Sequence, residues 1–137
     1  METDITQESC SRHITELLAN DGLSKMHIHQ MCSKKIMAIH DTMDVLNGKW
    51  KIAIISVLAF GERRYSELLR EVKGISGKVL SRELKDLEMN LLIKRTILDT
   101  QPITVKYELT PYCDKLLPII ENLAEWGAEH RQIVIGR

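Results

Sequence analysis

The chain of 137 residues carries no formal net charge at pH 7 and is 44% hydrophobic. This length fits one compact domain with a modest extension, and the apolar share supports a core, which excludes global disorder. The acidic start at Met1–Asp4 lacks the basic and apolar segments of a secretory signal, and the most apolar run, Ile52–Phe60, is far shorter than the roughly 20 residues that span a bilayer. We therefore expect a cytoplasmic protein, and a reducing compartment fits its three scattered cysteines, Cys10, Cys32 and Cys113.

The charge is unevenly distributed along the chain. Residues 49–106 carry 12 basic and 7 acidic side chains, a surplus of +5, whereas residues 1–48 carry 4 and 7 and residues 107–137 carry 3 and 5. Such sorting allows one face to be positive while the rest of the protein is neutral or acidic. A surplus of this size also occurs on ordinary solvated surfaces, so it supports nucleic-acid binding only in combination with a suitable fold.

The N-terminal third predicts two helices. The first covers residues 4–20, where the start has the spacing of a capping box and Asn20-Asp21-Gly22 ends the pattern. Residues 23–35 show no clear periodicity and predict a linker. A second helix is then expected up to Gly48, on apolar residues at helical spacing: Ile36, Ile39, Met43 and Leu46.

Three further helices are expected in the middle of the chain. Lys49–Phe60 is an apolar helix ended by Gly61. Ser66 is a good N-cap for a shorter helix that ends at Gly74. Ser76 caps the next helix, whose buried stripe consists of Leu80, Leu84 and Leu87.

The sequence period then changes from helical to two-residue. Two alternating runs, 93–98 and 104–109, flank a turn at Asp99–Pro102 and predict a β-hairpin. Thr110-Pro111, an N-cap followed by proline, starts a last helix. This helix is apolar on more than one face, which a small core cannot cover, so we expect a partner subunit against it. The expected interface residues are Leu116, Ile119, Ile120, Leu123 and Trp126.

Two short helices joined through Lys73-Gly74-Ile75 and followed by a hairpin describe a winged helix-turn-helix. We predict a mainly α fold with a small β-hairpin wing (α+β), and N- and C-terminal dimerisation helices. Opposite the leucine stripe lies the expected DNA-binding face, because its cations can neutralise phosphates or donate to guanine edges. Its members are Ser76, Gly77, Lys78, Ser81, Arg82 and Lys85. The wing offers a second set to an adjacent backbone or minor groove: Lys94, Arg95, Thr100, Gln101, Thr104 and Lys106. Ordinary solvated side chains are the alternative interpretation of both sets.

Several blocks of the chain resemble, in order and spacing, the HxlR-type branch of the MarR-like winged-helix regulators. They span about residues 37–130 and are Gly48–Lys51, Gly61–Leu68, Gly74–Ser81, Leu84–Glu88, Pro102–Thr110, Leu116–Pro118 and Trp126-Gly127. The resemblance implies a homodimeric, sequence-specific transcriptional regulator of double-stranded DNA with a pseudo-palindromic operator. It divides the chain into an N-terminal extension (1–35), a winged helix-turn-helix domain (36–131) and a C-terminal tail (132–137). Many family members have a redox-sensing cysteine thirteen residues before the tryptophan; here that position is Met37, so a thiol switch is not carried over.

The cysteine and histidine side chains suggest further hypotheses. Cys32 and Cys113 are candidate redox residues. Cys113 lies three residues past the Thr110 cap, where a helix dipole would lower a thiol pKa, although a small packed residue is the simpler interpretation. His27, His29 and Cys32 lack a fourth ligand nearby, so we expect no metal and no other cofactor. No catalytic constellation is apparent, so we do not expect an enzyme. Two alternatives stay open: a protein-interaction module, and a redox or ligand sensor whose DNA binding is secondary.

Overall fold

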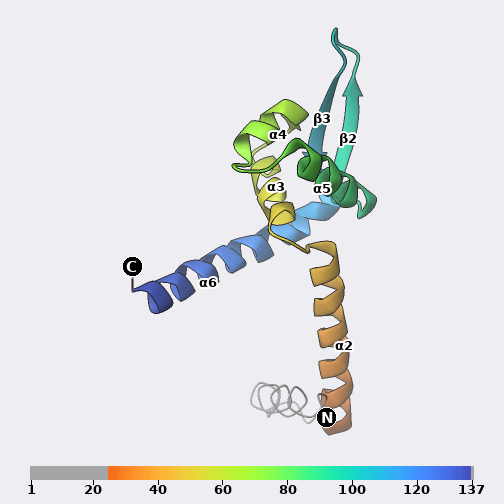
Figure 1. Cartoon of the computed structure of the whole chain (residues 1–137). Helices are drawn as coiled ribbons and strands as arrows, with labels where there is room; N and C mark the ends of the chain where they lie inside the picture. Colours follow the sequence, from red (N-terminus) through yellow and green to blue (C-terminus); the bar gives the residue numbers. More distant parts are fainter. Residues whose placement is uncertain (1–24, 137) are drawn as a thin grey trace. The chain divides into compact units, whose positions relative to one another are not determined.

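The computed structural model describes residues 25–136, with side chains from Cys32 onward (Figure 1). The chain divides into two compact units between Val45 and Leu46. The helix expected over residues 4–20 lies outside the described residues. Within residues 25–136, no helix is both long and apolar enough to cross a membrane.

The described part of the first unit is helix α2, Lys25–Val45. The prediction of a linker up to residue 35 is therefore wrong from Lys25 onward, and the domain boundary expected after residue 35 falls inside this helix. The periodicity is hard to read because α2 has no clean division into an apolar and a polar face. Its large apolar side chains Met37, Ile39 and Met43 are all exposed, whereas Cys32 is buried.

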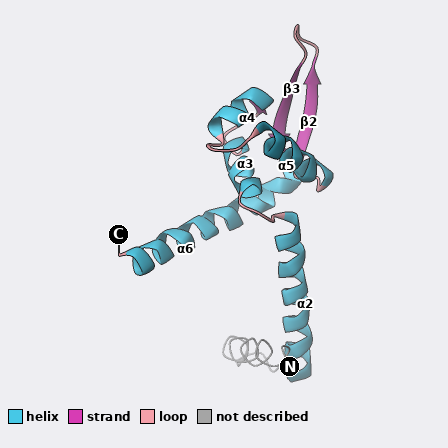
Figure 2. Cartoon of the chain, in the orientation of Figure 1, coloured by secondary structure: helices cyan, strands magenta, loops and turns pink. Residues whose placement is uncertain are grey.

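The second unit contains a helix-turn-helix followed by a hairpin. Its elements are α3 (Trp50–Leu58), β1 (Arg63–Arg64), α4 (Tyr65–Glu71), α5 (Gly77–Met89), β2 (Ile93–Leu98), β3 (Thr104–Leu109), the 3₁₀ helix η1 (Pro111–Leu116) and α6 (Leu117–Ile135). Figure 2 shows the helices α3, α4 and α5 grouped beside the long β2–β3 hairpin. This arrangement confirms the predicted mainly α fold with a β-hairpin wing.

The sheet is antiparallel, with strand order β1-β3-β2. The two long strands pair from Ile93 opposite Leu109 to Leu98 opposite Thr104, as the alternating pattern predicted. Strand β1 was not predicted, because two residues are too short for a period. It pairs with β3 through Arg63 opposite Tyr107, which joins the base of the wing to the start of α4.

The core lies between α3, α4, α5 and the sheet. The predicted leucine stripe of α5 is confirmed, since Leu80, Leu84 and Leu87 are at most 1% exposed. They are buried with Ile54 and Ile55 of α3 and with residues of α4 and the strands. Burying each large aliphatic side chain stabilises the fold by roughly 1.5–3 kcal/mol, so this stripe fixes which face of α5 remains outside.

The helix starts confirm two predicted caps and correct a third. Ser76 caps α5, because its Oγ accepts a hydrogen bond of 3.2 Å from the Val79 N–H. Thr110 likewise caps η1. The predicted cap Ser66 is wrong: the N-cap of α4 is Arg64, two residues earlier, and the Glu67 carboxylate accepts the Arg64 N–H at 2.8 Å.

The last helix begins later and ends later than predicted. The segment after Thr110 forms a 3₁₀ helix, and α6 starts only at Leu117. Pro118 lies in its first turn, where a residue without an N–H is tolerated, since the first turn has no intrahelical acceptor for that group. The helix then runs to Ile135 and so includes most of the expected C-terminal tail.

Candidate nucleic-acid interface

The outward face of α5 is cationic. Lys78, Arg82 and Lys85 are exposed on the side of the helix away from the leucine stripe, and Ser76 and Ser81 are exposed with them. In the part of the chain that the structure describes, neither Lys78 nor Lys85 forms an ion pair. Both ammonium groups are therefore available to an external anion.

The first turn of α5 is held by a tyrosine of α4 that the sequence analysis did not single out. The Tyr65 hydroxyl donates to the Gly77 carbonyl at 2.9 Å and lies 3.0 Å from the Ser81 Oγ. A Cβ on Gly77 would lie only 3.3 Å from the same hydroxyl. Gly77 thus permits the close approach of Tyr65, a packing role beside its expected role at DNA, and the Ser81 hydroxyl already has a partner.

A buried ion pair lies beneath this face. Lys51 of α3 is 2% exposed and Glu83 of α5 is 6% exposed, and the Lys51 ammonium contacts the Glu83 Oε2. The same ammonium donates to Asn47 Oδ1 at 2.9 Å and lies 3.4 Å from Asp86 Oδ2. Helices α3 and α5 are therefore joined by charge as well as by apolar contact.

The sequence contains a signal for this pair in the positions of its two charges. Lys51 stands four and seven residues before Ile55 and Leu58, on the apolar stripe of its helix, and Glu83 stands three residues after Leu80 on the stripe of α5. Each helix thus has a single charged residue on its buried stripe, one cation and one anion. Because a buried charge is costly unless it is paired, this pattern predicts that the two residues pair with each other.

The wing presents fewer available groups than the sequence predicted. Lys94, Arg95 and Gln101 are exposed. Lys106 instead forms an ion pair of 2.7 Å with Glu62, and this hydrogen bond raises the pKa of the Lys106 ammonium.

The turn of the wing is closed by two threonines. The Thr100 Oγ1 lies 2.9 Å from the Thr104 Oγ1 and donates to the Pro102 carbonyl at 2.9 Å. Both hydroxyls therefore stabilise the tip, and any contact of theirs with DNA would have to share these bonds.

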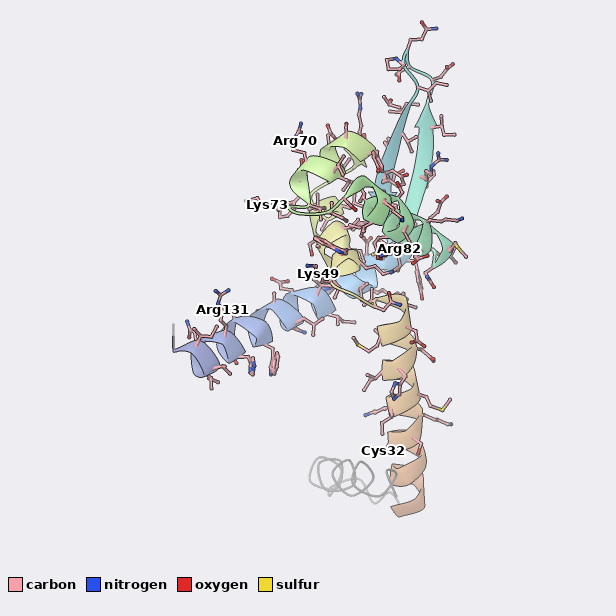
Figure 3. All side chains as sticks on the ribbon, viewed as in Figure 1. Cys32, Lys49, Arg70, Lys73, Arg82 and Arg131 are labelled. Atoms are coloured by element: carbon pink, nitrogen blue, oxygen red, sulfur yellow. The ribbon has the colours of Figure 1, made fainter. Side chains whose placement is uncertain are left out.

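Other exposed cations lie outside the predicted set. Figure 3 shows Arg70 and Lys73 projecting from α4 and the turn after it, and Arg82 projecting from α5. Arg64, the N-cap of α4, is also exposed. The sequence pattern predicted DNA contacts only for the second helix of the motif and for the wing, so these cations were not included.

The outer surface of α6 is apolar, as predicted. Ile119, Leu123 and Trp126 are each at least half exposed, while Leu116 and Ile120 are partly covered. The exposed apolar surface continues further than expected, through Ile133, Val134 and Ile135.

Cys113 does not have the environment that the sequence suggested. Its side chain is fully buried, and burial, with a smaller contribution from the Asp114 carboxylate, raises the pKa of the thiol. The expected lowering by a helix dipole is wrong, because the thiol lies in the core on a six-residue 3₁₀ helix. The packed-residue interpretation is the one that the geometry supports.

Among the described residues, no group of three or more His, Cys, Asp or Glu side chains could hold a metal ion.

Comparison with known proteins gives the same fold and a class of function. Residues 45–134 match the family described as HxlR-like helix-turn-helix. The chain is 37% identical over 100 residues to the HTH-type transcriptional regulator YtcD of Bacillus subtilis, an alignment that covers 73% of this chain and 79% of YtcD. A crystallised protein of Porphyromonas gingivalis W83, assigned to the MarR family of transcriptional regulators, is 41% identical, with a TM-score of 0.63 over 66% of this chain and 89% of that one. The reduced form of the redox regulator HypR is 29% identical, with a TM-score of 0.68 over 73% of this chain and 99% of that one.

Proposed function

The chain belongs to the HxlR-like helix-turn-helix family of transcriptional regulators, and we propose that it acts as a homodimer on a pseudo-palindromic duplex operator. Its relatives and structural neighbours are transcriptional regulators, so the protein is a regulator and not an enzyme. In the proposed complex α5 lies in the major groove and the β2–β3 wing lies beside it. The proposal includes action in the cytoplasm, where such a regulator meets its DNA.

The observation that carries this proposal is the exposed cationic face of α5. A core stripe on one side of the helix leaves Lys78, Arg82 and Lys85 together on the other side, and Tyr65 fixes the helix start beside them. Phosphate contacts supply affinity and orientation, while bidentate arginine contacts to guanine supply specificity. We assign both tasks to this face and the positioning task to Lys94 and Arg95 of the wing.

The homodimer is supported by the apolar surface of α6. Leu123 and Trp126 are exposed on a helix that has no buried residue of its own. Contiguous exposed apolar surface of this kind marks a protein interface. Helix α2, with Met37, Ile39 and Met43 exposed, is a second surface that a partner subunit would cover.

The decisive experiment is selection of bound sequences from a random duplex pool. We expect an imperfect palindrome whose half-sites are centred about one helical turn apart, roughly 34–36 Å. A Lys78→Gln, Lys85→Gln double variant, folded by circular dichroism, serves as the control and should enrich no sequence. Absence of any enriched sequence with the wild type would contradict the proposal, and binding to an acidic protein without a salt-dependent mobility shift on duplex DNA would favour an interaction module.

Redox control is a second candidate, favoured by the similarity to the redox regulator HypR. The cysteines to test are Cys32 of α2 and Cys113 of η1, both buried. If one of them is the sensor, its replacement by serine should abolish the release of DNA by an oxidant, and the other replacement should not. Release that survives both single replacements would exclude these two assignments.

A further inference from the structure

We propose that Glu83 is a positioning residue for DNA readout: it holds the Arg82 guanidinium in the orientation that reads a base edge, and it is itself held by the buried Lys51. This inference rests on the proposed binding of DNA by α5. It concerns discrimination between sequences and not the overall attraction to DNA, and it assigns a function to the buried ion pair of Lys51 and Glu83.

The two oxygens of the Glu83 carboxylate have different partners. Oε2 pairs with the Lys51 ammonium in the core, and Oε1 lies 3.4 Å from an Nη2 donor of Arg82. The side chain of Glu83 is only 8% exposed, whereas that of Arg82 is 64% exposed. One carboxylate therefore connects the interior of the domain with a guanidinium on the cationic face.

The orientation of the carboxylate is set from α3. An ammonium group has three donors and no acceptor, and Lys51 directs them to Asn47, Glu83 and Asp86. Because these three contacts hold the ammonium in place, Lys51 keeps the Glu83 carboxylate in one orientation. The cluster of Lys51 and Arg82 with Glu83 and Asp86 contains two cations and two anions, so it is neutral as a whole.

Holding Arg82 is useful because a free arginine loses much rotamer freedom when it binds. A side chain that is ordered beforehand loses less, and this favours the contact that needs a defined plane, namely the bidentate bond to guanine O6 and N7. The contact to Glu83 uses one Nη2 donor of five, so donors remain for the base. A phosphate contact has no such need of orientation, since it depends mainly on charge.

The carboxylate also has an opposite effect that makes the proposal testable. A negative charge beside a DNA-binding face repels phosphates, so Glu83 should weaken binding to DNA of any sequence. Replacing Glu83 by glutamine should therefore leave nonspecific affinity equal or slightly higher while it lowers specificity. A residue with a merely structural role would lower both affinities together when replaced.

The experiment is a double-mutant cycle on the full chain, with a selected operator and a random duplex as probes. We expect Glu83→Gln to reduce the ratio of the two affinities by about 3- to 10-fold in the wild-type background, and by less than about 2-fold in an Arg82→Ala background, because the pair is coupled. Glu88→Gln is the matched control, since it removes one exposed carboxylate from the same helix and should leave the ratio unchanged. Thermal unfolding of each variant establishes that it is folded.

A second variant covers the case in which Glu83→Gln does not fold. Lys51→Met, Glu83→Leu removes both buried charges and keeps apolar bulk, a change that buried ion pairs often tolerate. It should be folded and should lose the same part of the specificity ratio, again only when Arg82 is present.

Three results separate the inference from the proposed function. An unchanged ratio in the folded variants, or an equal loss with and without Arg82, overturns the positioning role and leaves DNA binding intact. An Arg82→Ala variant with wild-type specificity overturns it also, since there is then no contact to position. A wild-type protein that does not prefer any duplex over random DNA refutes the proposed function, and the inference falls with it.

Discussion

Replacing Lys85 by glutamine should reduce the salt dependence of DNA binding without unfolding the protein. The side chain is exposed on α5, and within the described residues it forms no ion pair. Its ammonium is thus free to replace a condensed counterion at a phosphate. Glutamine keeps the polarity and most of the length of the side chain, so only the charge is removed.

The size of the effect follows from counterion release. Each neutralised phosphate contributes about 0.9 to the slope of log K against log salt concentration on duplex DNA, so two copies of Lys85 in a dimer contribute about 1.8. Between about 50 and 200 mM salt, a fourfold change, the advantage of wild type over the variant should therefore shrink by roughly 12-fold. The variant binds less tightly at low salt and approaches the wild type at high salt.

Fluorescence anisotropy with the selected operator, repeated over that salt range, measures both slopes. Lys115→Gln on η1 removes an equal charge from another surface and should not change the slope. Lys106→Gln should change it less than Lys85→Gln does, because Lys106 is already paired with Glu62 at 2.7 Å. A folded Lys85→Gln variant with the wild-type slope would show that this face does not meet phosphates.

Four other outcomes are expected. Leu84→Ala should lower the free energy of unfolding by about 2–5 kcal/mol in urea titrations, because Leu84 is 1% exposed, and a loss under about 1 kcal/mol would contradict the packing of α5. Leu123→Asp should convert a species of about 31 kDa, twice the chain mass of 15.7 kDa, into a monomer in sedimentation, and persistence of the dimer would exclude α6 from the interface. Tyr65→Phe should destabilise the fold by about 1 kcal/mol in the same titrations and weaken operator binding, because the Gly77 carbonyl at the start of α5 loses the Tyr65 hydroxyl as its donor. Wild-type stability and wild-type affinity would contradict the role of Tyr65 in holding α5. Folding raises the pKa of Cys113, so the stability that the protonated thiol contributes should be complete at neutral pH and should be lost as the pH rises above 9.0 through the folded-state pKa. In unfolding measured against pH, Cys113→Ala should lack this alkaline loss of stability. An identical loss in the variant would assign the effect to another group.

Local sequence signals were sufficient where one interaction decides the structure. The hairpin follows from a two-residue period on both sides of a turn, and the structure has it at residues 93–98 and 104–109. The exposed face of α5 follows from its leucine stripe and from the Ser76 cap. These features depend on residues of the same helix or of two strands joined by one turn, so a single sequence contains the information for them.

Features that depend on distant partners were missed or misjudged. Strand β1 exists because Arg63 pairs with Tyr107, far along the chain. Helix α2 extends to Lys25 although its sequence has no clear apolar face. The Cys113 thiol was judged by its distance from Thr110 in sequence, whereas its pKa is set by the core that surrounds it. Long-range pairing accounts for β1, and burial accounts for the pKa of the Cys113 thiol.

Which cations are paired within the fold could not be predicted from the sequence either. This pairing also explains how a chain without net charge can bind DNA. Much of the acidic charge in the middle of the chain is used internally: Glu62 pairs with Lys106, Glu71 with Arg63, and Glu83 with Lys51. These pairs join Glu62 to the wing, β1 to α4, and α5 to α3. Among the described residues they leave Lys78 and Lys85 of α5 without an ion-pair partner, whereas Arg82 contacts Glu83. Net charge is therefore a poor guide to DNA binding in this protein, because several of the anions that cancel it are paired with cations that stabilise the fold, while Lys78 and Lys85 stay exposed.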